Sequence, residues 1–359
     1  MSKTSKPEQC SPEAEVRESW APRWGDVYRV AVVGAGSWGT AFARHVTLQG
    51  LETVLLCRRR DQAEIIAATG YNPDYLRQLR LPAELKVGVY PGHDLSRVDL
   101  VVMAVPSKGY AEAAGQLASR LPARIGVLSL AKGVEPGTLR RLSEVVADLW
   151  APLHPRLAVL AGPNHAEEVS LDQPTAGVIA SCDQVFAEAL QQLLSSETFR
   201  LYVNTDLVGV ELASAVKNII ALATGMSDGL GHGDNARAAL MTRGIAEMAR
   251  LGLALGAQPL TFAGLAGMGD LVATCTSRHS RNRLAGELIA LGHSPADVER
   301  EMGMVAEGLT AAPAILQLAR TLGVDMPITE NVVAIIRGQK EVRDSVRDLM
   351  LREPRSEHH

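Results

Sequence analysis

The chain has 359 residues, which is long enough for two domains with substantial hydrophobic cores. Hydrophobic residues make up 47% and charged residues 21%, a balance that is ordinary for a soluble globular protein. The formal net charge of −4 argues against nucleic acid as a partner, because a nucleic-acid-binding face needs an excess of positive charge.

Both ends of the chain are expected to be flexible. Residues 1–27 are polar and mixed in charge, and they lack the apolar run of a signal peptide. The charged tail over residues 346–359 is interpreted in the same way. No stretch reaches the roughly 18 uninterrupted apolar residues that a membrane span needs. These features predict a cytoplasmic protein, in which the four scattered cysteines, without CxxC spacing, are reduced thiols.

The first folded element is predicted to be a strand that passes through a glycine-rich turn into a helix. The strand covers residues 30–33, the turn holds Gly34, Gly36 and Gly39, and the helix-favouring segment covers residues 40–48. This spacing lets the first glycine make the turn, the second admit a pyrophosphate and the third pack helix on strand. The helix N-terminus then offers free N–H groups to phosphates. The arrangement predicts a dinucleotide site.

The second predicted strand, residues 53–57, ends in three consecutive arginines, Arg58, Arg59 and Arg60. An NAD-selective site usually places an acidic residue about 20 positions after the glycine turn, to bind the ribose 2′-hydroxyl. A guanidinium group can instead neutralise a 2′-phosphate and stack on adenine. The sequence therefore favours NADPH over NADH, although a solvated cluster of charges at the strand end is the alternative.

Further apolar runs alternate with helical segments. The predicted strands are residues 87–90, 99–105, 125–130, 157–161 and 201–203. Such alternation is typical of an open parallel sheet with helices on both faces. Polar or glycine-rich clusters follow several of these strands, at the edge where parallel sheets bind ligands. We therefore predict a Rossmann domain over residues 28–204.

The alternation stops after residue 203, so residues 205–345 are predicted to form an all-α domain. Residues 206–225 leave no wide polar face on a helix, which is typical of a buried helix. Lys217 lies in its middle, where an ammonium group is costly unless it is paired or its pKa falls. Either outcome suits a proton-transfer group, and a lysine that reaches solvent from the helix edge is the alternative.

Two later segments offer partners for Lys217. A glycine-rich turn over residues 264–269 delivers Asp270, whose carboxylate is placed to pair with the lysine. Residues 277–283 place arginine, hydroxyl and amide groups before a helix, which suits a phosphate group, with a solvated basic loop as the alternative. No set of side chains has metal-ligand spacing. Two histidines in polar loops are interpreted as surface residues: His232 and His279.

Seven motifs occur along the chain. They are residues 34–41 (GAGSWGTA), 131–135 (AKGVE), 162–166 (GPNHA), 211–218 (ELASAVKN), 264–271 (GLAGMGDL), 280–282 (SRN) and 305–308 (VAEG). In this order, over about residues 28–343, the chain resembles the NAD(P)-dependent glycerol-3-phosphate dehydrogenases of the bacterial biosynthetic type. The resemblance implies a Rossmann domain, a helical domain and an active site between them. It also implies reduction of dihydroxyacetone phosphate to sn-glycerol 3-phosphate, for glycerophospholipid synthesis.

The resemblance implies roles for individual residues as well. Lys217 looks like the proton donor in reduction and the acceptor in oxidation. The implied substrate contacts are Lys132, Gly162, Asn164, Lys217, Asp270, Ser280, Arg281 and Asn282. The implied cofactor contacts, beyond the glycine turn, are Ser37, Trp38, Arg58, Lys132, Ala166, Arg281, Val305 and Glu307. One departure is that the family commonly has Ser and Phe where this chain has Asn164 and His165.

The resulting hypothesis is hydride transfer to the substrate carbonyl while Lys217 protonates the developing alkoxide. Lys132 supplies positive charge, Asp270 holds Lys217, and the phosphate binds at Arg281 and Asn282. Two alternatives remain: a β-hydroxyacid dehydrogenase that acts on a carboxylate, and a non-catalytic NADPH-binding protein. Apolar helices with few aromatics favour a homodimer. Four glycines are expected to form loops that let the domains close around ligand: Gly225, Gly229, Gly231 and Gly233.

Overall fold

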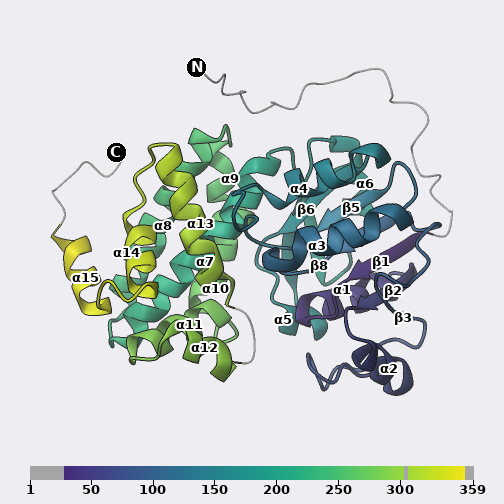
Figure 1. Cartoon of the computed structure of the whole chain (residues 1–359), viewed down its shortest axis with the longest axis horizontal. Helices are drawn as coiled ribbons and strands as arrows, with labels where there is room; N and C mark the ends of the chain where they lie inside the picture. The colour runs from purple at the N-terminus through teal and green to yellow at the C-terminus, as the bar shows by residue number, and fades with distance from the viewer. Residues whose placement is uncertain (1–27, 303–305, 352–359) are drawn as a thin grey trace.

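The structure, a computed structural model, describes residues 28–302 and 306–351. It has two parts, an α/β part built on one sheet and an all-helical part beside it (Figure 1). This confirms the predicted fold class. The expected N-terminal extension and Val305 lie outside the described residues. The expected flexible tail is partly wrong, because helix α15 (Val342–Met350) continues past residue 345.

The sheet has eight strands in the order β3-β2-β1-β4-β5-β6-β7-β8. Their bounds are β1 Arg29–Val33, β2 Glu52–Cys57, β3 Lys86–Val89, β4 Leu100–Met103, β5 Gly126–Ser129, β6 Arg156–Ala161, β7 Thr175–Ala180 and β8 Phe199–Asn204. Strands β1 to β6 pair in parallel, and so do β7 and β8, but β6 and β7 are antiparallel. The prediction of a wholly parallel sheet is therefore wrong at this pair.

The antiparallel step has a simple geometric reason. Strand β7 had no counterpart among the predicted strands, and it follows the short helix α5 (Ala166–Ser170). Five helical residues advance the chain by only about 7 Å, whereas six strand residues advance it by about 20 Å. The helix therefore cannot return the chain to the opposite edge, and β7 runs back beside β6.

Helices cover both faces of the sheet. Because side chains alternate along a strand, Val30 and Val32 of β1 face one way and Ala31 and Val33 the other. The first pair packs with helices α1 (Ser37–Leu48), α2 (Arg60–Thr69) and α6 (Gln184–Leu194). The second pair packs with α3 (Ser107–Leu117) and α4 (Leu142–Leu149). This layering agrees with the predicted Rossmann domain.

The helical part is built around α7 (Leu207–Gly229), which begins just after β8. The helices around it are α8 Asp234–Ala254, α9 Pro259–Ala263, α10 Asp270–Thr276, α11 Arg281–Ala290, α12 Pro295–Met302, α13 Glu307–Thr321, α14 Pro327–Ile336 and α15. Length and composition alone would let α7 cross a bilayer, but 89% of its most apolar window is buried inside the protein. We therefore interpret α7 as the core helix of this part.

Glycines bring α7 and α11 unusually close together. A Cβ atom on Gly225 would lie 1.9 Å from the Arg283 carbonyl oxygen, and one on Gly286 would lie 2.1 Å from that of Leu222. No side chain fits at either position. The expectation of a closure loop at Gly225 and Gly229 is therefore wrong, because both lie within α7 and serve helix packing.

Two of the cysteines, Cys57 and Cys275, are buried and free. Burial raises the pKa of each thiol to about 11, so neither is a reactive thiolate. Cys182 is disulfide-bonded, so the prediction of reduced thiols is wrong at that position.

Candidate active site

The carboxyl ends of four parallel strands, β1, β4, β5 and β6, meet along one edge of the sheet. The glycine turn follows β1, Lys132 follows β5, and the Gly162 to Ala166 motif follows β6. Open α/β sheets bind ligands at this edge. Segments that are far apart in the sequence are thus brought to one side of the sheet.

The glycine turn leaves space where a pyrophosphate would pass. Gly34 has a φ of +108°, and a Cβ there would lie 2.6 Å from the Ala104 carbonyl oxygen. A Cβ on Gly39 would lie 1.9 Å from the carbonyl oxygen of Gly34. Gly36, at the N-terminus of α1, has no atom within 4 Å of the Cβ position. The fold thus requires glycine at 34 and 39, while the open space at Gly36 fits a bound dinucleotide.

Side chains that the sequence analysis did not single out hold this turn in place. Asn72 Nδ2 donates to the Ala35 carbonyl at 3.0 Å and to Thr40 Oγ1 at 2.9 Å. Gln62 Nε2 donates to the same carbonyl at 3.2 Å. Both side chains are buried. Nothing in the local sequence around Asn72 indicates this role, because its partners lie more than 30 residues away.

The two cofactor candidates Trp38 and Arg58 differ in their surroundings. The indole Nε1 of Trp38 is buried and bonds to none of the described residues. An unsatisfied buried donor is costly, so a ligand acceptor at this position would remove a penalty. Arg58 is exposed at the end of β2 and has no ion pair among the described residues, whereas its neighbour Arg59 pairs with Asp74 at 2.6 Å. Arg58 is therefore available to an added anion, whereas Arg59 is already paired.

Lys217 lies at the centre of a buried charged cluster. It is only 3% exposed, and its Nζ bonds to Asp270 Oδ1 and, at 2.8 Å, to Thr274 Oγ1. The other carboxylate oxygen of Asp270 accepts from Lys132 Nζ at 3.3 Å. Lys132 follows β5, so the cluster joins the two parts of the molecule. The alternative in which the Lys217 amine reaches solvent is wrong.

Burial, reinforced by the charge of Lys132, lowers the pKa of Lys217 to about 7, although Asp270 opposes the shift. Burial on its own raises the pKa of Asp270, but the two ammonium groups outweigh it and hold this pKa below its ordinary value. Near neutral pH the carboxylate is therefore ionised, and the Lys217 amine exists in both protonation states. That is the property required of a group that gives and takes a proton.

The motif after β6 faces this cluster with unsatisfied polar atoms. Gly162 has a φ of +117°, and Asn164 is buried with neither amide atom bonded to any described residue. His165 Nε2 lies 3.4 Å from the Ala273 carbonyl oxygen of α10. Burial and the nearby charges of Lys217 and Lys132 lower the pKa of His165. Asn164 is thus the side chain with free hydrogen-bonding capacity.

A second polar network starts at the residue next to Lys217. Asn218 Nδ2 donates to Glu307 Oε2 at 3.1 Å, and its Oδ1 accepts from Asn282 Nδ2 at 3.0 Å. Asn282 Oδ1 in turn accepts from the Gly308 backbone at 2.8 Å. The Asn282 side chain thereby joins α7, α11 and α13 through one donor and one acceptor bond. Three residues predicted to share the site, Lys217, Asn282 and Glu307, are therefore brought together through α7.

The start of α11 combines a capped helix end with one unpaired arginine. Ser280 Oγ accepts from the Arg283 N–H at 3.2 Å and caps the helix. Arg281 is exposed and forms no ion pair within the described part of the chain. The arrangement offers backbone N–H groups and a guanidinium group to an anion.

The chain matches one known protein family over most of its length. Residues 29–187 match the N-terminal profile and residues 206–347 the C-terminal profile of NAD-dependent glycerol-3-phosphate dehydrogenase. The chain belongs to this family. A glycerol-3-phosphate dehydrogenase [NAD(P)+] of Chlorobium phaeobacteroides is 44% identical over 333 residues, covering 92% of this chain and all of the relative. That of Geobacillus thermodenitrificans is 46% identical over 330 residues, covering 91% of this chain and 96% of the relative.

A solved structure agrees with this glycerol-3-phosphate dehydrogenase assignment. The crystal structure of the Coxiella burnetii glycerol-3-phosphate dehydrogenase is 37% identical and superposes with a TM-score of 0.87. The superposition covers 90% of this chain and 99% of the Coxiella burnetii chain. The family resemblance stated from the sequence is confirmed.

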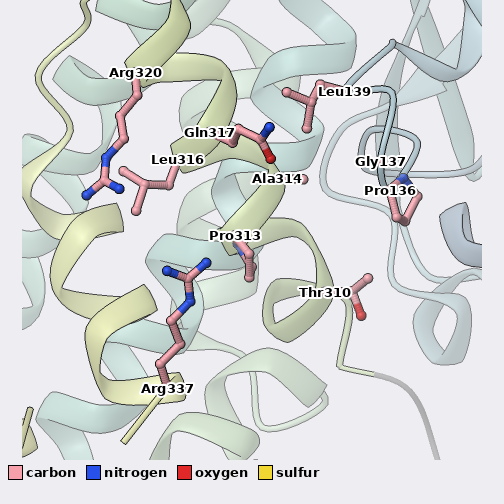
Figure 2. Close-up of a pocket in the computed structure, with 10 residues that line it drawn as sticks. All are labelled: Pro136, Gly137, Leu139, Thr310, Pro313, Ala314, Leu316, Gln317, Arg320 and Arg337. Carbon is pink, nitrogen blue, oxygen red and sulfur yellow. The ribbon is translucent and has the colours of Figure 1, made fainter. Parts of the chain in front are cut away.

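Two cavities of this dehydrogenase are lined by none of the charged residues Lys132, Lys217 and Asp270. One, of about 360 Å³, separates the loop at Pro136, Gly137 and Leu139 from α13, with Arg320 and Arg337 on its rim (Figure 2). The other, of about 460 Å³, is bordered by His165, the end of α10 and Arg278. Neither is lined by Lys217. Within residues 28–302 and 306–351, no group of three or more acidic, histidine or cysteine side chains is placed to hold a metal.

Some residues of the site were not singled out from the sequence. Thr274 is one turn after Asp270 on α10, and this spacing of four residues, which puts both on one helix face, was the available signal that went unused. His165 was noted only as a departure from the family pattern. The glycine-rich segment before Asp270 is not an open turn but includes a π-helical segment, Leu265–Gly269, of a kind common at functional sites.

Proposed function

We propose that this protein reduces dihydroxyacetone phosphate to sn-glycerol 3-phosphate with NAD(P)H, in a reversible reaction, and that Lys217 is the proton donor. The observation that carries the proposal is the buried contact of Lys217 with Asp270, completed across the molecule by Lys132. A cation at this depth is expensive to maintain. Family membership supports the same activity. A non-catalytic cofactor-binding protein would have no use for this cluster.

The charged cluster supplies the proton and stabilises negative charge. The substrate carbonyl gains negative charge on its oxygen as the hydride arrives at carbon, and the Lys217 ammonium group donates a proton to that oxygen. Asp270 orients the amine, and Lys132 adds a second positive charge beside it. Because these charges are preorganised in a site poor in water, they stabilise the transition state more than solvent would.

Bound NAD(P)H supplies the hydride. The residues that would hold it are the turn at Gly34, Gly36 and Gly39, the start of α1 at Ser37 and Trp38, and Arg58 at the adenine end. Among the described residues, the proposed set is completed by Lys132, Ala166, Arg281 and Glu307. The open space at Gly36 and the unpaired Trp38 indole support this assignment. The unpaired, exposed Arg58 supports a preference for NADPH.

The substrate is proposed to bind through its phosphate at the start of α11. Arg281 supplies a guanidinium group, while Ser280 and Asn282 hold the helix start in place through their own bonds. Gly162 and Asn164 follow β6 in the other part, and the amide of Asn164, which has no partner among the described residues, is available to a substrate oxygen. Cytoplasmic location, a homodimer and a supply of substrate for glycerophospholipid synthesis are further proposals.

The test is the decrease in absorbance as NADPH or NADH is oxidised by wild-type protein. We expect turnover with dihydroxyacetone phosphate and none with a panel of oxidised 3-hydroxy acids, which a β-hydroxyacid dehydrogenase would use. The variant Lys217→Ala should lose at least about 1,000-fold in kcat while its NADPH dissociation constant changes little, since proton transfer and charge stabilisation are both lost. Near-normal turnover of this variant would rule out the proposed role.

A further inference from the structure

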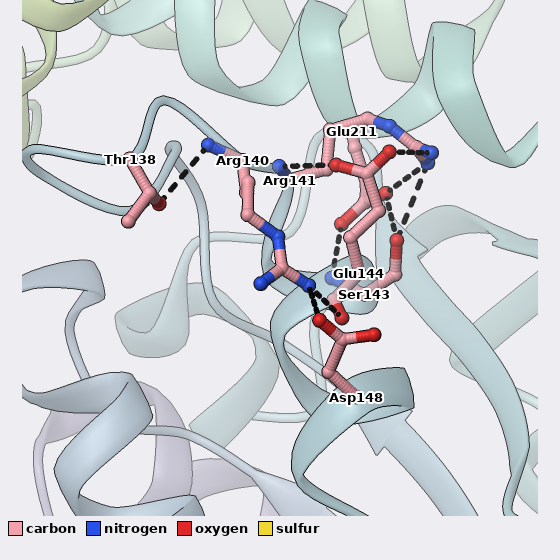
Figure 3. A network of polar contacts seen from close by, with 7 residues as sticks. All are labelled: Thr138, Arg140, Arg141, Ser143, Glu144, Asp148 and Glu211. Atoms are coloured by element: carbon pink, nitrogen blue, oxygen red, sulfur yellow. Dashed lines mark hydrogen bonds and ion pairs between the residues drawn. The ribbon is translucent and has the colours of Figure 1, made fainter. Parts of the chain in front are cut away.

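A second interdomain contact lies on α7, six positions before Lys217. The Glu211 carboxylate accepts from the Ser143 N–H at 2.9 Å, from Ser143 Oγ at 2.5 Å and from Arg141 Nη1 at 2.9 Å (Figure 3). Arg141 and Ser143 lie at the start of α4, in the nucleotide-binding part. The contact therefore fastens the central helix of one part to a helix of the other.

Glu211 caps a helix that belongs to another part of the molecule. The first N–H groups of a helix lack partners within it. In α4, the Glu144 carboxylate accepts from the Arg141 N–H at 2.9 Å, and Glu211 accepts from the Ser143 N–H. Glu211 is 6% exposed, so its three bonds form away from solvent. A buried carboxylate of this kind tolerates little displacement, because a lost partner leaves a desolvated charge.

The capped segment leads back to the charged cluster. Lys132 and Arg141 lie at the two ends of one loop after β5. The loop is closed by a bridge between Val134 and Arg141 and by a bond from the Glu135 N–H to the Arg140 carbonyl at 2.8 Å. Glu211 thus holds the far end of the loop whose near end carries Lys132. Because α7 is a continuous helix, the same contact fixes the position of Lys217 about 9 Å further along its axis.

We propose that Glu211 is a positioning residue: its bonds to Arg141 and Ser143 set the placement of Lys217 relative to Lys132. This inference rests on the proposed role of Lys217. Glu211 touches none of the reacting groups and acts through α7 and the Lys132 loop. When the contact loosens, Lys217 moves away from Lys132 while its partners Asp270 and Thr274, which lie in the same helical part, stay with it.

The expected change in the charge on Lys217 has a defined sign. The titratable groups that face it are Asp270, Lys132, His165 and the Cys275 thiol. Moving Lys132 away removes a repulsive charge, and a looser junction admits solvent. Both changes favour the protonated amine. Since reduction requires the protonated form, the alkaline limb of its pH profile should move to higher pH.

The variant Glu211→Gln keeps the size of the side chain and replaces one acceptor with a donor. We expect kcat/KM for dihydroxyacetone phosphate reduction to fall about 10- to 100-fold, the range in which small misplacements act. The NADPH dissociation constant should remain within twofold. The alkaline limb of the kcat/KM profile should move upward, and this readout would not follow from a stability loss alone.

The chain offers a matched control. Glu247 of α8 is also buried and also caps a helix start, accepting from the Ile328 N–H at 2.5 Å and from Thr329 Oγ1 at 3.0 Å. Both of its partners lie on α14, within the helical part. Glu247→Gln therefore shares any general cost of replacing a buried capping carboxylate. It should leave kcat/KM and the alkaline limb at their wild-type values.

The inference is overturned if Glu211→Gln and Glu247→Gln have the same kcat/KM and if the alkaline limbs of their pH profiles lie at the same pH. If Glu211→Gln does not fold, Ser143→Ala is the fallback variant, because it removes one of the three donors to Glu211. It should shift the alkaline limb of the kcat/KM profile in the same direction but by less. An unchanged alkaline limb in Ser143→Ala would then overturn the inference. If the wild-type protein does not reduce dihydroxyacetone phosphate, that result refutes the proposed function instead.

Discussion

Replacing Lys132 by Met tests the electrostatics of the candidate site most directly. The change keeps the length of the side chain but removes the ammonium group that Lys132 places on the Asp270 carboxylate. Lys217 binds the same carboxylate. The two ammonium groups bind the two oxygens of Asp270 and repel each other; for unit charges separated by about 5 Å at an effective dielectric constant near 20, such repulsion is about 3 kcal/mol. That energy corresponds to about two pKa units.

Solvent reduces this value. The Lys132 side chain is 17% exposed, so part of its field is screened, and we expect the Lys217 pKa to rise by about one unit in Lys132→Met. The protonated form then persists to higher pH, and the alkaline limb of kcat/KM for reduction moves upward from about 7 by that amount. The value of kcat should also fall, because a charge that stabilises the alkoxide is lost.

The assay is NADPH oxidation at saturating cofactor and low ketose phosphate, from about pH 6 to about pH 10, across the ordinary lysine range. Lys108→Met is the control, since Lys108 is an exposed lysine at the start of α3 and has no contact with Asp270 among those the structure records. Its profile should match the wild type. A limb in Lys132→Met that stays in place, or moves to lower pH, would refute the assigned electrostatics.

Two further predictions concern the cofactor. Gly36→Ala should keep the wild-type melting temperature, because the added Cβ meets no protein atom, but it should raise the KM for NADPH about tenfold or more. Gly39→Ala should lower the free energy of unfolding in urea by about 1–3 kcal/mol, because its Cβ would collide with the backbone. Equal melting temperatures for the two variants would contradict this prediction. Arg58→Ser should raise the KM for NADPH about tenfold, consistent with losing one charged hydrogen bond, and leave that for NADH unchanged. Arg60→Ser, also exposed, is its control, and a parallel rise for NADH would exclude 2′-phosphate recognition.

The sequence was most informative where local chemistry alone decides the structure. The glycine spacing at Gly34, Gly36 and Gly39 and the apolar surroundings of Lys217 predicted a strand–turn–helix and a buried cation, and both are present. Asp270 was identified because a carboxylate after a glycine-rich segment is a natural partner for a buried lysine. These features depend on short stretches of chain.

Features that depend on distant contacts were beyond sequence reasoning. Glu211 appeared only as part of a motif, since its partners on α4 are about 70 residues away and nothing in either segment marks the pair. Gly225 looked like a loop residue because glycine weakens an isolated helix, and only the approach of α11 explains it. The antiparallel direction of β7 was not predicted, because the shortness of α5 matters only once the sheet is known.

The adjacency of Lys217 and Asn218 has a consequence for motion. One bonds to Asp270 and the other to Glu307 and Asn282, so consecutive residues of α7 join the charged cluster to the start of α11. The proposed acid and the proposed phosphate anchor therefore belong to a single rigid block. Any swing of the two halves leaves the spacing between these groups constant and alters only how near the block comes to the nucleotide. The helical part therefore presents the acid and the phosphate anchor at a fixed spacing, and the other part brings Lys132, Asn164 and the nucleotide to them.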